Sequence, residues 1–366
     1  MYQDKDSRIQ NFDILRGFFI FLALWQHFSY YLNVWYIDFF KENAVLDKSY
    51  HIHKMMIGYL LPVDDFSHWA AWFFTPWVSQ IYLTLAAFNL AKRSQGDFKL
   101  VYGLKLRTFG LILIFFIFEN FIVSPNFGES ISFYPIMAWM IILSALSYLY
   151  QKFGVKGIWG LLIISFTRWT LPELPFISGL EYWMQQNVHS AYEFDAQIEY
   201  FLTSGCLGFF LGFYYYHRDW GQKREFYLIG SGFLLFMIWY FFGLPFSVNY
   251  LDVFESEHDL AKTFLGSLSI LGIQMMILPL FLFMEKKHKL KIKIPMFTWI
   301  GVHSLKLFAL HRILFVHIIV PVMLLIVTII NRPLIITWWI CWLSTGIVML
   351  VGYFINKTKI HNLILR

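Results

Sequence analysis

The first apolar stretch of the chain carries three ionisable residues that suit transfer chemistry. Asp13, Arg16 and His27 lie within residues 13–34, which are otherwise almost entirely hydrophobic. In an α-helix Arg16 and His27 would lie within about 20° of one face and about 16 Å apart along the axis. A guanidinium binds an anionic group, and a neutral imidazole farther along the same groove accepts a proton from a hydroxyl or an amine. The structural alternative is an Asp13–Arg16 ion pair at the start of the helix, with His27 hydrogen-bonded in the core.

A second histidine, His68, follows two aspartates in the segment DDFSHWAAWFFTPW. A carboxylate beside a histidine fixes its tautomer and raises its basicity, so we expect His68 to lie at a depth similar to His27 and to share its site. The alternative is an interfacial aromatic belt, which would equally account for Trp69, Trp72 and Trp77.

Two further segments carry charge next to or inside apolar stretches. Lys105 and Arg107 begin residues 104–123, where they act either as anchors at the inner surface or as contacts to the phosphates of a nucleotide-like donor. The segment WIGVHSLKLFALHRILFVHII is denser still, because it contains His303, Ser304, Lys306, His311, Arg312 and His317. So many ionisable groups cannot all face lipid, so part of this helix must line a polar interior, and His311 would lie about 12 Å deeper than His303.

The elements that must position these residues are membrane helices. Of the 366 residues, 58% are hydrophobic and only 14% are charged, which excludes an ordinary water-soluble enzyme. The apolar residues form about ten runs near 20 residues long, the length that crosses a hydrocarbon core of about 30 Å. We predict an all-α polytopic membrane protein, with residues 1–366 forming one transmembrane domain. The predicted spans are 13–34, 68–90, 104–123, 131–150, 156–172, 196–216, 226–245, 263–284, 303–329 and 334–355. Residues 295–333 form either one span preceded by a short interfacial or re-entrant segment, Pro295 to Val302, or two short spans; we prefer one span, because two would send the basic C-terminus outside.

The positions of the basic residues predict the orientation. Most of the 29 Lys and Arg residues fall on one side if the N-terminus is cytoplasmic, whereas the outer loops keep only Lys41, Lys48, Lys54, Lys262 and Arg332. The positive-inside rule therefore places both termini in the cytoplasm. The net charge of +6 reports this topology rather than nucleic-acid binding, because the basic residues form no continuous stripe.

The chain contains no motif for several other kinds of chemistry. We find no GxSxG elbow, P-loop or HExxH motif, and no histidine and cysteine spacing suited to zinc, so we predict no metal site. Cys206 and Cys341 both lie in apolar runs and predict no disulfide framework. Gly208 and Gly212 form a GxxxG pair, which predicts close helix packing and nothing more.

Residues 8–32, RIQNFDILRGFFIFLALWQHFSYYL, resemble the opening of the integral-membrane acyltransferase superfamily, which includes the acyltransferase-3 family and relatives of heparan-alpha-glucosaminide N-acetyltransferase. The D-x-L-R-G core and the spacing from arginine to histidine match that opening. Residues 299–311 are similar to the family's G-x-x-S-L-x-x-Y-x-x-H segment, with Phe308 in place of the usual tyrosine. The residues that carry the resemblance are Arg8, Asp13, Leu15, Arg16, Gly17, His27, Gly301, Ser304, Leu305 and His311.

The resemblance implies transfer of an acyl group, usually acetyl, from cytoplasmic acyl-CoA to a sugar or lipid-linked acceptor across the membrane. Arg16 would assist donor binding and His27 would be the catalytic base. We therefore take His27, His68 and Asp13 as the candidate catalytic residues, and Arg16, Lys105, Arg107, Ser304 and His311 as the candidate acyl-CoA-binding residues. The expected setting is a bacterial inner membrane, and the expected acceptor is a hydroxyl or amine of an envelope glycan or glycolipid.

Two other functions compete with this one. A secondary transporter or lipid flippase would use the same buried Arg and His groups to relay protons or bind substrate. A pseudoenzyme or assembly factor of an envelope complex is a weaker possibility. Only the acyltransferase hypothesis gives a reason for the D-x-L-R-G core, the matched histidine and the serine and histidine of the later segment to occur together.

Overall fold

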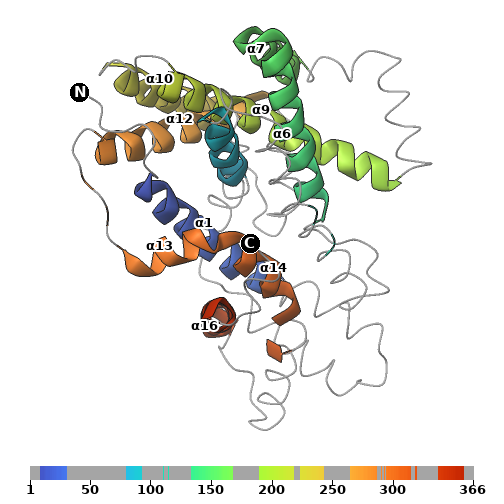
Figure 1. The fold of residues 1–366 in the computed structure, drawn as a ribbon, viewed down its shortest axis with the longest axis vertical. Helices are drawn as coiled ribbons and strands as arrows, with labels where there is room; N and C mark the ends of the chain where they lie inside the picture. Colours follow the sequence, from blue (N-terminus) through green and yellow to red (C-terminus); the bar gives the residue numbers. More distant parts are fainter. Residues whose placement is uncertain are drawn as a thin grey trace. The chain divides into compact units, whose positions relative to one another are not determined.

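The structure is a computed structural model. It describes residues 9–30, 80–92, 110, 114, 133–167, 189–217, 223–242, 264–286, 290, 292, 294–314, 318–319 and 337–357. Within these ranges every regular element is a helix (Figure 1). The all-helical prediction is thus confirmed for the described residues.

These helices group into two compact units. The first unit holds the start of α1 (Gln10–Tyr30) up to Phe12, the helix of residues 80–92, α6 (Phe133–Phe153), α7 (Val155–Thr167), α9 (His189–His217), α10 (Arg224–Phe242) and α12 (Phe264–Lys286). The second unit holds α1 from Asp13 onward, α13 (Pro295–Val302), α14 (Ser304–Leu314) and α16 (Thr337–Lys357). The single domain expected over residues 1–366 stays a prediction.

The helices agree closely with most of the predicted spans. The predicted segment from Pro295 to Val302 is a separate helix, α13, with the same limits. It ends at His303, whose φ of −106° and ψ of 13° interrupt the helix before α14 begins at Ser304. The predicted span at 104–123 lies outside the described residues, apart from two single positions.

Glycine allows α9 to approach its neighbours in the first unit. A Cβ on Gly208 would lie 2.2 Å from the carbonyl oxygen of Thr84, and one on Gly212 would lie 2.4 Å from that of Phe88. The GxxxG pair therefore packs backbone to backbone against the helix of residues 80–92, which confirms the expected close packing. The two helices run parallel, because both contacts advance along the chain together.

Polar side chains tie three helices of this unit together. The Thr84 hydroxyl lies 2.8 Å from the carbonyl oxygen of Gln80 and 3.3 Å from that of Ser204 in α9. From α12, Gln274 Nε2 donates a hydrogen bond of 2.8 Å to the Ser204 hydroxyl. The side chains of Thr84, Ser204 and Gln274 are fully buried, so these bonds give partners to two hydroxyl groups and to one amide nitrogen that would be costly to leave unpaired in an apolar interior.

The helices α10 and α12 form an antiparallel pair in the first unit (Figure 1). A Cβ on Gly232 would lie 2.5 Å from the carbonyl oxygen of Gly272, and one on Gly272 would lie 2.6 Å from that of Gly232. At the other end of the pair, the rings of Phe226 and Phe283 meet edge to face with centroids 5.2 Å apart. The pair thus meets closely through two reciprocal glycines.

Among the described residues, two helical stretches are long and apolar enough to cross a membrane. They are Arg224–Phe242 and Ser267–Lys286, and the shorter apolar helical stretches Val155–Ser165 and Trp342–Phe354 accompany them. Large hydrophobic side chains on α10, such as Tyr227, Leu234 and Phe242, are exposed, which suits contact with lipid tails.

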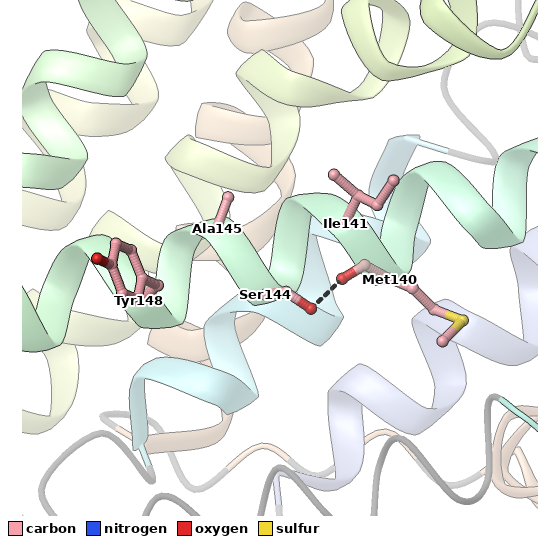
Figure 2. A pocket seen from close by; sticks show the side chains of 5 residues that line it. All are labelled: Met140, Ile141, Ser144, Ala145 and Tyr148. Atoms are coloured by element: carbon pink, nitrogen blue, oxygen red, sulfur yellow. Dashed lines mark hydrogen bonds between the residues drawn. The ribbon is translucent and has the colours of Figure 1, made fainter. Parts of the chain in front are cut away.

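A shallow groove runs along one face of α6 (Figure 2). Its lining is apolar apart from two hydroxyl groups, one of which, that of Ser144, donates a 2.5 Å hydrogen bond to the carbonyl oxygen of Met140 in the preceding turn. Ile141, Ala145 and Tyr148 complete the lining. We assign no chemistry to this groove.

Candidate functional site

In the second unit, the two segments that carry the family resemblance meet at a crossing of α1 and α13. A Cβ on Gly17 would lie 1.9 Å from the carbonyl oxygen of Phe297, and one on Gly301 would lie 1.7 Å from that of Asp13. Neither distance is possible for a real side chain, so both positions require glycine. The crossing therefore brings the D-x-L-R-G core into direct contact with the start of the later segment.

Aromatic rings pack around this crossing. The ring of Phe297 meets those of Phe18 and Phe21 edge to face, with centroids 5.9 and 5.8 Å apart. Phe21 also lies 4.8 Å from the ring of Trp342 in α16, which in turn lies 6.4 Å from the ring of Trp25. Aromatic contacts of this kind fix the rotation of a helix as well as its position.

Asp13 and Arg16 form an ion pair on α1. Arg16 Nη1 donates to Asp13 Oδ1 over 3.1 Å, across one turn of the helix. The Asp13 side chain is 4% exposed and that of Arg16 is 21% exposed, so Arg16 is the more accessible partner of the pair. The ion pair expected under the structural alternative is thus present, and it also holds the guanidinium in one place for an anionic partner.

His311 is fully buried on α14, one helix beyond the crossing. Its Nδ1 is paired with the carbonyl oxygen of Phe308, and this partner requires Nδ1 to carry the proton. Ser304 opens the same helix and is half-buried. Leu307 holds α14 against α16, where a Cβ on Gly352 would lie 2.4 Å from the Leu307 side chain.

Other candidate residues lie outside the description of the structure. His27 belongs to α1, but its side chain is not among the described ones. His68, Lys105 and Arg107 lie outside the described residues altogether. Their assigned roles stay predictions. No group of three or more His, Cys, Asp and Glu residues suited to a metal ion occurs in the described ranges.

Sequence reasoning missed Glu285, which caps the first turn of α1 within the first unit. The backbone N–H groups of Gln10 and Asn11 donate to the two carboxylate oxygens of Glu285 over 3.0 and 2.7 Å. Helix N-termini leave such N–H groups unpaired and attract negative charge. The signal in the sequence was a lone carboxylate at the start of a lysine-rich segment, Glu285 to Lys293.

Asn11 completes this cap. Its amide nitrogen donates to the carbonyl oxygen of Leu290 over 3.1 Å, and its Oδ1 accepts from the backbone N–H of Ile292 over 3.1 Å. Asn11 is fully buried and Glu285 is 5% exposed, so the hydrogen bonds are shielded from water. The start of α1 is therefore fixed to the end of α12 and to the chain that follows it.

Comparison of the chain with protein-family models, with curated proteins and with solved structures finds no match, so no relative assigns a role to these residues.

Proposed function

We propose that this protein is a membrane-bound acyltransferase that takes an acyl group, acetyl in the simplest case, from cytoplasmic acyl-CoA. The acceptor is a hydroxyl or amine of an envelope glycan or glycolipid. One observation carries the proposal: the two segments that resemble the acyltransferase superfamily lie about 280 residues apart in the chain, yet Gly17 and Gly301 pack them against one another. A transporter gives no reason for this pairing of motifs.

The residues divide the reaction between donor and acceptor. Arg16, held by Asp13, binds an anionic part of acyl-CoA, with Ser304 and His311 on the neighbouring segment and Lys105 and Arg107 as further donor contacts. This division follows from the chemistry of the side chains, because a guanidinium binds phosphate well and a neutral imidazole makes a good base.

His27, with His68, activates the acceptor. The acceptor oxygen or nitrogen attacks the thioester carbonyl carbon and the carbon–sulfur bond breaks. The proton leaves the acceptor through the histidine and ends on the CoA thiolate, so the step needs no further reactant.

The directions of the helices support the membrane setting. The predicted topology requires residues 68–90, 131–150 and 196–216 to run from outside to inside. Contacts in the first unit agree, because α9 is parallel both to the helix of residues 80–92 and to α6. These directions suit a multi-pass membrane chain, and the setting that we propose for it is a bacterial inner membrane.

The antiparallel pairs agree as well. Ser165 near the end of α7 contacts Thr203 within α9, while Trp159 nearer its start contacts Phe210 farther along α9. The α6–α7 hairpin reverses at Gly154, whose φ of +61° is the left-handed conformation that glycine adopts without strain. The antiparallel pairs α7–α9 and α6–α7 therefore have the opposite directions that the predicted topology gives to these spans.

The decisive experiment is thiol release from acetyl-CoA by the purified protein in detergent, with a soluble envelope glycan as acceptor. We expect release that depends on the acceptor, and a loss of about 100- to 10,000-fold in His27→Ala, the usual contribution of a general base. His27→Ala must keep the elution volume and helical circular dichroism of the wild type. Unchanged release by a folded His27→Ala protein would overturn the assignment, and flux of an unmodified substrate without thiol release would favour the transporter.

A further inference from the structure

The ends of two parallel helices in the first unit bring basic and aromatic side chains together. Because Gly208 and Gly212 lock α9 onto the helix of residues 80–92, the two helices finish at the same level. His217 Nε2, at the end of α9, lies 2.8 Å from the carbonyl oxygen of Ala91, to which it donates. Lys92 and His217 therefore lie at neighbouring ends of the two described helices, although 125 residues separate them along the chain.

Lys92 and Tyr216 form the centre of this cluster. The Lys92 ammonium lies 5.4 Å from the centroid of the Tyr216 ring, within the range of a cation–π interaction. Both residues are half-buried, so the pair is reachable from solvent while its apolar parts are covered. An ammonium beside an aromatic ring offers both a phosphate contact and a stacking surface for a base.

The start of α1 adjoins this cluster in the same unit. The ring of Phe88 lies 5.4 Å from that of Tyr216 and 5.2 Å from that of Phe12, both edge to face. The cluster thus adjoins the end of α1 that is predicted to be cytoplasmic.

We propose that Lys92, Tyr216 and His217 bind the phosphorylated adenine nucleotide end of the acyl-CoA donor. This inference rests on the proposed function and adds a donor contact beyond the residues predicted from the sequence. Lys92 contacts the phosphates and Tyr216 stacks on the adenine. His217 holds the two helix ends together and so places both groups.

The test uses the purified full-length protein and adenosine 3′,5′-bisphosphate, which represents the nucleotide end of CoA without its thiol. We expect Lys92→Gln and Tyr216→Leu each to weaken binding at least tenfold in isothermal titration calorimetry, and Tyr216→Phe to bind as the wild type does. The matched control is Lys152→Gln, because Lys152 is an exposed lysine that lies 5.9 Å from the Tyr148 ring in a similar pair elsewhere in the unit. Equal affinity in all four variants would overturn the inference.

The same chemistry would attract the phosphate of an anionic lipid, so a second measurement separates the two sources. We expect the bisphosphate to bind in nanodiscs of phosphatidylcholine and to retain its affinity when phosphatidylglycerol is added. Competition by phosphatidylglycerol, or equal binding of inorganic pyrophosphate, would overturn the assignment to a nucleotide. If the wild-type protein binds the bisphosphate but transfers no acyl group, the proposed function is refuted and the nucleotide site stands. If Lys92→Gln transfers the acyl group with an unchanged Michaelis constant (KM) for acetyl-CoA, only the nucleotide site is refuted.

Discussion

The carbonyl oxygen of Asp13 lies so close to Gly301 that a methyl group at that position would come within 1.7 Å of it. Asp13 also accepts the hydrogen bond from Arg16 through its side chain. One residue therefore joins the crossing of two helices to the guanidinium of the candidate donor site. The ion pair of Asp13 and Arg16 therefore lies directly beside this crossing.

Gly17→Ala and Gly301→Ala should each destabilise the protein by about 1–3 kcal/mol, the usual range for overpacking a tight contact. In both variants the new Cβ would meet backbone atoms, so the rotation of a side chain cannot relieve the contact. Thermal unfolding in detergent measures the effect. The matched control is Gly346→Ala in α16, where a Cβ meets nothing within 4 Å and alanine should stabilise the helix by about 0.5–1 kcal/mol. Equal stability of all three variants would contradict the crossing.

If Arg16 binds the donor as proposed, Arg16→Ala should raise the KM for acetyl-CoA about 10- to 100-fold and change kcat much less, because the substitution removes a charged hydrogen-bond donor from the proposed acyl-CoA site. Asp13→Asn should shift the KM in the same direction, since its carboxylate orients the guanidinium. The double variant should be no worse than Arg16→Ala, because the two residues act as one unit. Steady-state kinetics of thiol release test this, and additive losses would show that Asp13 has a separate role.

Glu285→Ala should cost about 1–3 kcal/mol of stability, because it leaves two backbone N–H groups at the buried start of α1 without their acceptor. Glu285→Gln keeps one oxygen and should fall between this variant and the wild type. Resistance to unfolding by SDS is a suitable measurement. Gln151→Ala, on the exposed end of α6, serves as the control and should leave stability unchanged. If Glu285→Ala is as stable as the wild type, the cap contributes nothing to stability.

Gly208→Ala should destabilise the first unit by about 1–3 kcal/mol, since the new Cβ would meet the backbone of Thr84. The comparison is Gly230→Ala in α10, where nothing lies within 4 Å of a Cβ. Thermal stability of the two variants in the same detergent decides the point. A stable Gly208→Ala protein would show that α9 and the helix of residues 80–92 lie farther apart than the structure places them.

The sequence determined the helical class of the described residues and the approximate position of several helices, because hydrophobic length and charged ends are local properties. The short helix from Pro295 to Val302 was predictable in the same way, since a proline suits the first turn of a helix. The predicted role of Arg16 also came from local spacing, and its Asp13 partner lies one turn away.

Only the tertiary structure decided which distant residues meet. Nothing local indicates that Gly301 packs on Asp13, that Glu285 caps α1, or that Lys92 lies over Tyr216. The physical reason is that a glycine contact, a helix cap and a cation–π pair each need a partner supplied by another helix. The sequence of one helix shows which of its positions are apolar and which are polar, but not which other helix packs against them.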